Sequence, residues 1–146
     1  MDWVYLFTAV HGRISRQPFL IACGVLTLVE IAGQWLAYRI QGDRLAILVD
    51  LAFTYPEFAL SVKRANDRNL PLWLLGIFFA TSVMLDLFSV VGWAGTDASP
   101  STLAYAIAIP FTAFGIALLV ELGFRKGTVG PNPHGRDPLA GTNRTS

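Results

Sequence analysis

Four long apolar runs constrain the fold of this chain more than any other feature. They cover residues 19–38, 45–62, 70–93 and 102–124. Each run is long enough to cross a hydrocarbon core of ~30 Å at ~1.5 Å rise per residue. Helices satisfy every backbone polar group inside lipid, where water cannot. The runs therefore predict an all-α integral membrane protein whose four transmembrane helices pack as a bundle.

Composition leaves little of the chain outside these runs. Of the 146 residues, 53% are hydrophobic and 14% are charged, whereas a soluble domain carries about a quarter charged residues. The runs and their short connectors use most of the length. We therefore expect residues 1–146 to form a single membrane domain that ends in a tail at 125–146.

The distribution of basic residues predicts the orientation. With both chain ends in the cytoplasm, nine Lys and Arg residues lie inside, and Arg39 and Arg44 lie outside. Because basic residues are retained on the cytoplasmic side, we expect both termini there. The first run exceeds a signal-peptide core in length and precedes no small-x-small cleavage site, which favours an uncleaved span.

Aromatic residues fall where this topology places the membrane interfaces. Amphipathic rings favour the headgroup level. The expected inner group comprises Trp3, Tyr5, Trp73 and Phe124, and the outer group comprises Trp35, Tyr38, Trp93 and Tyr105.

Five carboxylates lie within or at the edge of the apolar runs, the last of them Glu121 near the end of the fourth run. An Asp near a helix centre costs ~2.5–3.5 kcal/mol on insertion scales, so we expect such groups to face protein or water. Helical spacing places each of the other four on one polar face of its helix. The predicted intramembrane polar cluster consists of Glu30, Asp50, Glu57 and Asp86.

This cluster has two interpretations. It is either a hydrogen-bonded structural network, with Arg39 or Arg44 as counter-ions, or an outward-open pocket for a cation, a proton or a small solute. The second interpretation describes a small transporter or channel-like protein. Because four helices are few for a transporter monomer, it would require an oligomer.

Three sequence strings lie on the predicted cytoplasmic face. They read GRISR at residues 12–16, KRANDR at 63–68 and KGTVGPNPHGRDP at 126–138. Because these three strings occur in this order and at this spacing, the chain resembles the DUF805 family of small bacterial inner-membrane proteins. The resemblance covers nearly the whole chain. It implies the architecture and a bacterial inner-membrane location, but no activity.

The chain also departs from the family pattern. Asn66 stands before Asp67 where the family usually has His, and His134 stands where Tyr is common. The Ser-Gly-Trp that usually follows the second motif reads Leu70-Pro71-Leu72-Trp73 in this chain. A role that depends on the histidine of the second motif is therefore not carried over.

The inner-face strings also predict a binding surface. Basic residues beside a membrane each contribute about 1 kcal/mol of attraction to anionic lipid. Two other interpretations of these basic residues remain. They are either the ordinary charge signal that orients a membrane protein, or part of a folded cap in which Asp67 pairs with Arg13 or Arg16 and the tail forms ordered turns. The candidate lipid or partner contacts are Arg13, Arg16, Lys63, Arg64, Asp67 and Arg68.

No pattern in the chain indicates catalysis. The tail lacks the lysine of a phosphate-binding loop and the strand-turn-helix context of a dinucleotide site, and two histidines make a poor metal set. We expect no catalytic residues, no cofactor, no metal and no nucleic-acid partner. The expected function is a non-enzymatic membrane module that binds anionic lipid, a membrane protein or a second copy of itself.

Overall fold

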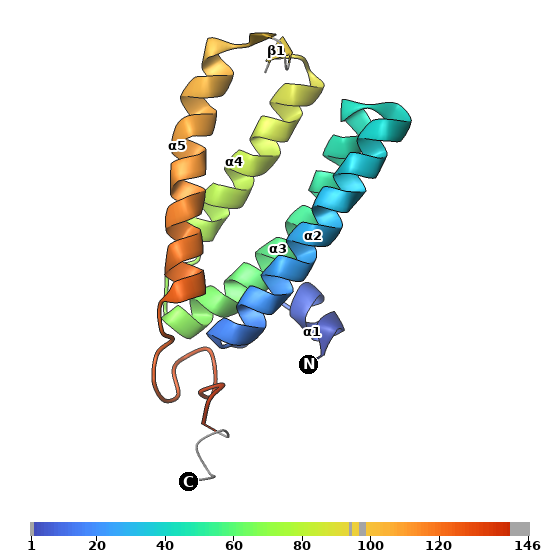
Figure 1. The fold of residues 1–146 in the computed structure, drawn as a ribbon. Helices are drawn as coiled ribbons and strands as arrows, with labels where there is room; N and C mark the ends of the chain where they lie inside the picture. Colours follow the sequence, from blue (N-terminus) through green and yellow to red (C-terminus); the bar gives the residue numbers. More distant parts are fainter. Residues whose placement is uncertain (1, 94, 97–98, 141–146) are drawn as a thin grey trace.

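The computed structural model describes residues 2–93, 95–96 and 99–140. Long helices dominate these residues (Figure 1). The elements are α1 (Trp3–Thr8), α2 (Arg16–Gln41), α3 (Asp43–Arg68), α4 (Trp73–Val90), β1 (Gly95–Thr96), β2 (Ser99–Pro100), α5 (Thr102–Leu119) and the π-helical turn η1 (Val120–Phe124).

Two helical hairpins make up the body of the molecule. Gly42 alone links α2 to α3, with a φ of 71° that suits glycine. The link between α4 and α5 contains the antiparallel pair β1–β2, and its residues 94, 97 and 98 lie outside the described residues. The hairpins meet near the chain termini and diverge toward their tips (Figure 1).

Aromatic rings hold the two hairpins together where they meet. Phe58 of α3 contacts Phe79 of α4 edge-on, with 5.4 Å between ring centroids. Within the second hairpin, Phe78 of α4 stacks on Phe111 of α5 at 4.7 Å. Such pairs contribute about 0.5–1.5 kcal/mol beyond area burial, so they fix one end of the assembly.

The predicted apolar runs all lie in helices that are long and apolar enough to cross a membrane, so four such helices are present. Large apolar side chains on them are exposed, including Leu28 at 70% and Ile109 at 68%. An apolar surface of this extent indicates a nonaqueous surrounding. The chain therefore has the architecture of a multi-pass membrane protein.

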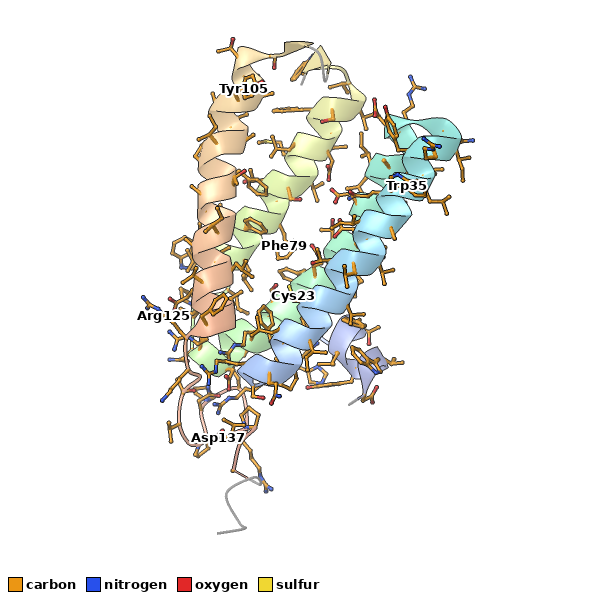
Figure 2. The ribbon with its side chains drawn as sticks, in the orientation of Figure 1. Cys23, Trp35, Phe79, Tyr105, Arg125 and Asp137 are labelled. Atoms are coloured by element: carbon orange, nitrogen blue, oxygen red, sulfur yellow. The ribbon has the colours of Figure 1, made fainter. Side chains whose placement is uncertain are left out.

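The aromatic residues lie at the two ends of these helices, as expected. Trp35 lies near the end of α2 and Tyr105 in the first turn of α5, both at the hairpin tips (Figure 2). Trp73 begins α4 and Phe124 ends η1 at the opposite end. These four side chains are more than half exposed, as in the aromatic belts of membrane proteins.

One boundary differs from the expectation. Asn and Asp are residue types typical of turns and helix N-caps, which favours a turn at Asn66–Asp67 and a cap at Asn69, but α3 continues through Arg68. Asn69 instead ends α3 in the left-handed conformation, at a φ of 54°. The Leu70 N–H bonds the Ala65 carbonyl, which closes the α3 terminus.

The N-terminal helix α1 was not predicted from the sequence. The Asp2 carboxylate caps it by accepting a hydrogen bond from the Tyr5 N–H at 3.1 Å. The Tyr55 hydroxyl of α3 donates to the Thr8 carbonyl at 2.7 Å. The segment before the first span is therefore folded against α3.

Candidate functional site: the polar cap and the intramembrane carboxylates

A buried ion triplet lies at the center of the end where the hairpins meet. Asp67 accepts hydrogen bonds from Arg13 Nε at 3.1 Å and Nη2 at 3.0 Å. Its other carboxylate oxygen pairs with Arg64 Nη1. The side chains of Arg13, Arg64 and Asp67 are no more than 4% exposed. The predicted pairing of Asp67 with Arg13 is confirmed.

Arg13 also binds the tail that follows η1. Its Nη2 donates to the Thr128 carbonyl at 2.7 Å, and its Nη1 donates to the carbonyls of Gly130 at 2.8 Å and Gly135 at 3.2 Å. One guanidinium therefore joins the start of α2, the end of α3 and the tail. We call this assembly of residues 12–16, 63–68 and 126–138 the polar cap.

Arginine side chains from α2 and α3 satisfy the carbonyls at the end of η1. The Arg64 Nε donates to the Leu122 carbonyl at 2.6 Å, and its Nη2 donates to the Arg125 carbonyl at 2.5 Å. Arg16 reaches the Phe124 carbonyl at 3.4 Å, and Arg68 bonds the Lys126 carbonyl. Cations favour a helix C-terminus, where the carbonyls lack backbone partners.

Lys63 has no exposed surface. Its ammonium donates to the carbonyls of Tyr5, at 3.1 Å, and Ala9. It also lies 5.2 Å from the center of the Tyr5 ring. Lys63 therefore ties α1 to α3, and charge-assisted hydrogen bonds offset part of the cost of its burial.

Backbone and side-chain bonds complete the cap. The Asn66 side chain donates to the Gly12 carbonyl at 3.1 Å, and Asn132 donates to the Asn66 carbonyl at 2.9 Å. Gly127 passes so close to Asp67 that a Cβ there would lie 2.0 Å from Oδ2. The tail thus forms the ordered turns expected for it, at least through residue 140; residues 141–146 lie outside the described part of the chain.

Asp137 stabilises the outer turn of the tail. Its carboxylate accepts hydrogen bonds from the N–H groups of Gly130 and Leu139, both at 2.9 Å. These bonds, first that from Leu139 and then that from Gly130, lower the pKa of the Asp137 carboxyl.

The predicted inner-face contact residues therefore divide into two groups. Arg13, Lys63, Arg64 and Asp67 are buried and cannot reach lipid. The alternative prediction of a cap accounts for the pairing of Asp67 with Arg13, but it did not include the burial of Lys63 and Arg64. Arg68 pairs with Glu121 at 2.5 Å, which leaves Arg16 as the exposed member of the set.

A cavity of about 270 Å³ opens beside the triplet. Arg16 and Lys126, both exposed, contribute to its walls. The remaining lining residues come from the start of α2, the end of α3 and the tail: Ser15, Arg64, Asp67, Gly127, Thr128, Val129, Asp137, Pro138 and Leu139. Sequence reasoning placed Lys126 among the basic residues at the inner membrane surface, but it did not predict a cavity between Lys126 and the tail.

The four predicted intramembrane carboxylates gather between the two hairpins. Gln34 Nε2 donates to Glu30 Oε1 and Asp50 Oδ1, both at 3.0 Å. The Glu30 carboxyl lies near those of Asp50 and Glu57, and the Asp86 carboxyl lies near that of Asp50. Three helices thus contribute to one group of acids.

These carboxylates have no cationic partner among the described residues. The acids of the ion pairs found there are Asp67 and Glu121, and their partners are Arg13, Arg64, Arg68 and Arg125. The predicted counter-ion role of Arg39 is not observed: its guanidinium lies 5.6 Å from the center of the Trp35 ring. Asp86 Oδ2 is buried with no hydrogen-bond partner in the described part of the chain.

The described residues form four helices long and apolar enough to cross a membrane, with a buried ionic cap at one end, which is the pattern typical of multi-pass α-helical membrane proteins. Comparison with known families identifies which one. The model of the DUF805 family, described as "protein of unknown function", matches residues 7–136. The chain belongs to this family.

Relatives of known sequence agree with this assignment. The chain is 26% identical over 144 residues to the uncharacterized protein YiiR of Escherichia coli K12, covering 93% of this chain and 88% of the relative. The YiiR protein of E. coli O157:H7 matches to the same extent. No solved structure matches the chain.

Proposed function

We propose that this protein is a non-enzymatic module of the bacterial inner membrane that binds the phosphate of an anionic lipid in the cavity of the polar cap. Both chain ends would lie in the cytoplasm, so that the cap faces the inner leaflet. The observation that carries the proposal is the 270 Å³ cavity with two exposed cationic side chains at its wall, Arg16 and Lys126.

The charges around the cavity favour an anion. The two acids in its lining are already engaged: Asp67 by two guanidinium groups and Asp137 by two backbone N–H groups. No ion pair of the Lys126 ammonium occurs among residues 2–93, 95–96 and 99–140. Ser15, the N-cap residue of α2, makes no side-chain capping bond. The α2 N-terminus therefore adds positive potential to that of Arg16 and Lys126.

The depth of the cavity suits a lipid headgroup. It lies at the same end of the molecule as the exposed rings of Trp73 and Phe124. Aromatic rings of this kind lie at the headgroup level of a bilayer. A lipid whose acyl chains contact the exposed apolar helix surface would place its phosphate at the cavity opening.

Lipid selectivity tests the proposal. The full chain is assayed for binding of fluorescent phosphatidylglycerol against phosphatidylcholine. The double variant Arg16→Gln/Lys126→Gln should lose about 2 kcal/mol of the preference, roughly thirtyfold, because each cation contributes about 1 kcal/mol. The matched control Arg39→Gln/Arg44→Gln removes the same charge at the opposite end. Equal losses in both variants would refute a specific site.

Labelling tests the orientation separately. In a Cys23→Ala background, Val129→Cys and Gln41→Cys place single thiols at opposite ends, both at exposed positions. A membrane-impermeant reagent added to intact cells should label residue 41 and not residue 129. The reverse pattern would place the cap outside and remove the inner-leaflet assignment.

A second candidate function is that of a small oligomeric transporter or channel-like protein that uses the intramembrane carboxylates. The gathering of Glu30, Asp50, Glu57 and Asp86 without a cationic partner in the described residues favours it. Solute or proton flux in proteoliposomes that disappears with Glu57→Gln would support this function over lipid binding alone.

A further inference from the structure

The region where the two hairpins meet contains a second cavity, of about 190 Å³. It is separate from the cap cavity and shares no lining residue with it. Phe19 and Cys23 contribute from α2, Glu57 from α3, and Phe78 and Phe79 from α4. Cys23 and Phe79 are labelled where the hairpins come together (Figure 2).

The lining of this cavity combines aromatic rings with one carboxyl group. Phe19, Phe78 and Phe79 supply π faces, and Leu, Gly and Cys side chains complete an almost entirely apolar wall. Glu57 is the one ionisable acid in the lining, and Ser61 adds a hydroxyl one helical turn away. A cationic group on an occupant would pair with the Glu57 carboxyl, an interaction that a purely apolar occupant, such as an acyl chain, cannot make.

The surroundings of Glu57 are rich in carboxyl groups. Its carboxyl lies near that of Glu30, and the Glu30 and Asp50 carboxyls both accept hydrogen bonds from Gln34. No Lys or Arg pairs with these acids among the described residues. Neighbouring carboxyl groups without a base need a proton or a cation between them, so a cationic occupant would complete the site.

The kind of cation follows from the walls. Within the part of the chain that the structure describes, no group of His, Cys, Asp and Glu side chains is arranged to hold a metal ion. Aromatic faces attract an organic ammonium through the ring quadrupole. A cavity of about 150 Å³ is known to hold a benzene ring, so 190 Å³ accommodates one ring with a small ammonium group.

We propose that the cavity between the hairpins binds a small hydrophobic ammonium ion, whose charge pairs with the Glu57 carboxyl while its apolar body contacts Phe78 and Phe79. This site is independent of lipid binding in the polar cap, because the two cavities have different residues and opposite charge preference.

Benzyltrimethylammonium is the probe for this site, and equilibrium dialysis against the full chain in nanodiscs is the measurement. We expect saturable binding that Glu57→Gln weakens at least tenfold. The matched control Asp43→Asn removes an exposed carboxylate at the start of α3 and should leave the affinity unchanged. Binding that is not saturable, or that Glu57→Gln preserves, would overturn the proposal.

Two further comparisons keep the test decisive. Ser61→Leu retains every carboxyl but fills the cavity, so it should also weaken binding at least tenfold even if Glu57→Gln fails to fold.

Neopentylbenzene has nearly the shape of the probe without its charge and should not displace it. Equal displacement would identify a neutral apolar site and contradict the role of Glu57. Unchanged phosphatidylglycerol selectivity in Glu57→Gln is expected and separates this proposal from the lipid site.

Discussion

The two polar regions of this protein solve the problem of burying charge in opposite ways. In the polar cap, Asp67 lies between two arginines, and each guanidinium has further carbonyl partners. Between the hairpins, carboxyl groups face one another, and Gln34 is the side-chain donor that bridges two of them. In the cap the buried acid is paired with arginines, although Asn66 Oδ1 and Arg68 Nε have no hydrogen-bond partner in the part of the chain that the structure describes. The intramembrane cluster lacks a positive partner in the described residues.

This difference separates structural from ligand-binding acids. A buried ion pair contributes little net stability over an apolar pair, but removing one partner is costly because a charge is left uncompensated. Asp67 therefore has a structural role that no ligand need complete. Facing carboxyls without a base require a proton or a cation between them, so the intramembrane cluster is the better place to look for exchange with the surroundings.

The largest effect should come from Asp67→Asn. This change leaves Arg13 and Arg64 buried without a counter-charge, and we expect a loss of about 3–5 kcal/mol in the free energy of unfolding. Denaturant unfolding in detergent measures it, and Asp43→Asn is the control for removing an exposed aspartate. A loss below 1 kcal/mol would mean that the cap is not the structural center described above.

Gly127→Ala probes the same contact from the side of the tail. The added Cβ would lie 2.0 Å from Asp67 Oδ2, so the tail must shift. Overpacking of this kind costs about 1–3 kcal/mol. Proteolysis of the tail, together with unfolding, reports the shift.

Gly76→Ala is the matched control, because an added Cβ at this helical position in α4 meets no atom within 4 Å. Alanine favours a helix by about 1 kcal/mol over glycine. The two glycines should therefore respond with opposite sign, and equal responses would contradict the close packing of Gly127.

Asp86→Asn makes the same chemical change as Asp67→Asn in the other region, and the effect should be much smaller. The new amide supplies a donor toward Asp50 and removes a like charge, so we expect no loss and a gain of up to about 1 kcal/mol. Unfolding under the same conditions measures it. A loss as large as that of Asp67→Asn would abolish the distinction between the two regions.

The sequence revealed the two regions unequally. The carboxylates were predictable because helical spacing places Asp50 and Glu57 on one face of a long apolar helix, and this face is independent of tertiary contacts. The apolar runs were predictable for the same reason, since length and hydrophobicity are local properties. The carboxylates and the apolar runs could therefore both be predicted without knowledge of how the helices pack.

The cap was only partly predictable. The pairing of Asp67 with Arg13 could be anticipated as one of two arginine choices, but the burial of Lys63 and Arg64 could not. Lys and Arg beside an apolar run normally read as exposed charges. Their burial depends on carbonyls from α1 and η1, more than fifty residues distant in sequence. The helix α1 itself carried one local signal, the Asp2 cap before Tyr5.

The smallest predicted effect concerns Asp137, at the exposed edge of the cap. The hydrogen bonds from Leu139 and Gly130 lower the pKa of this carboxyl in the folded chain. Its contribution to stability is therefore complete above the unfolded aspartate pKa of about 3.9, and it is lost as the pH falls through the lower folded value.

The backbone amide resonances of Gly130 and Leu139 should consequently remain unchanged from pH 7 down to the ordinary aspartate range and move only below it. Asp137→Asn should abolish that movement while leaving the Arg13 contacts with the tail intact. If the resonances instead titrate at the ordinary aspartate value, the outer turn is not held by this carboxylate. Because Asp137 is the cap's outermost acid, the ordered network would then end at the Arg13–Gly130 contact.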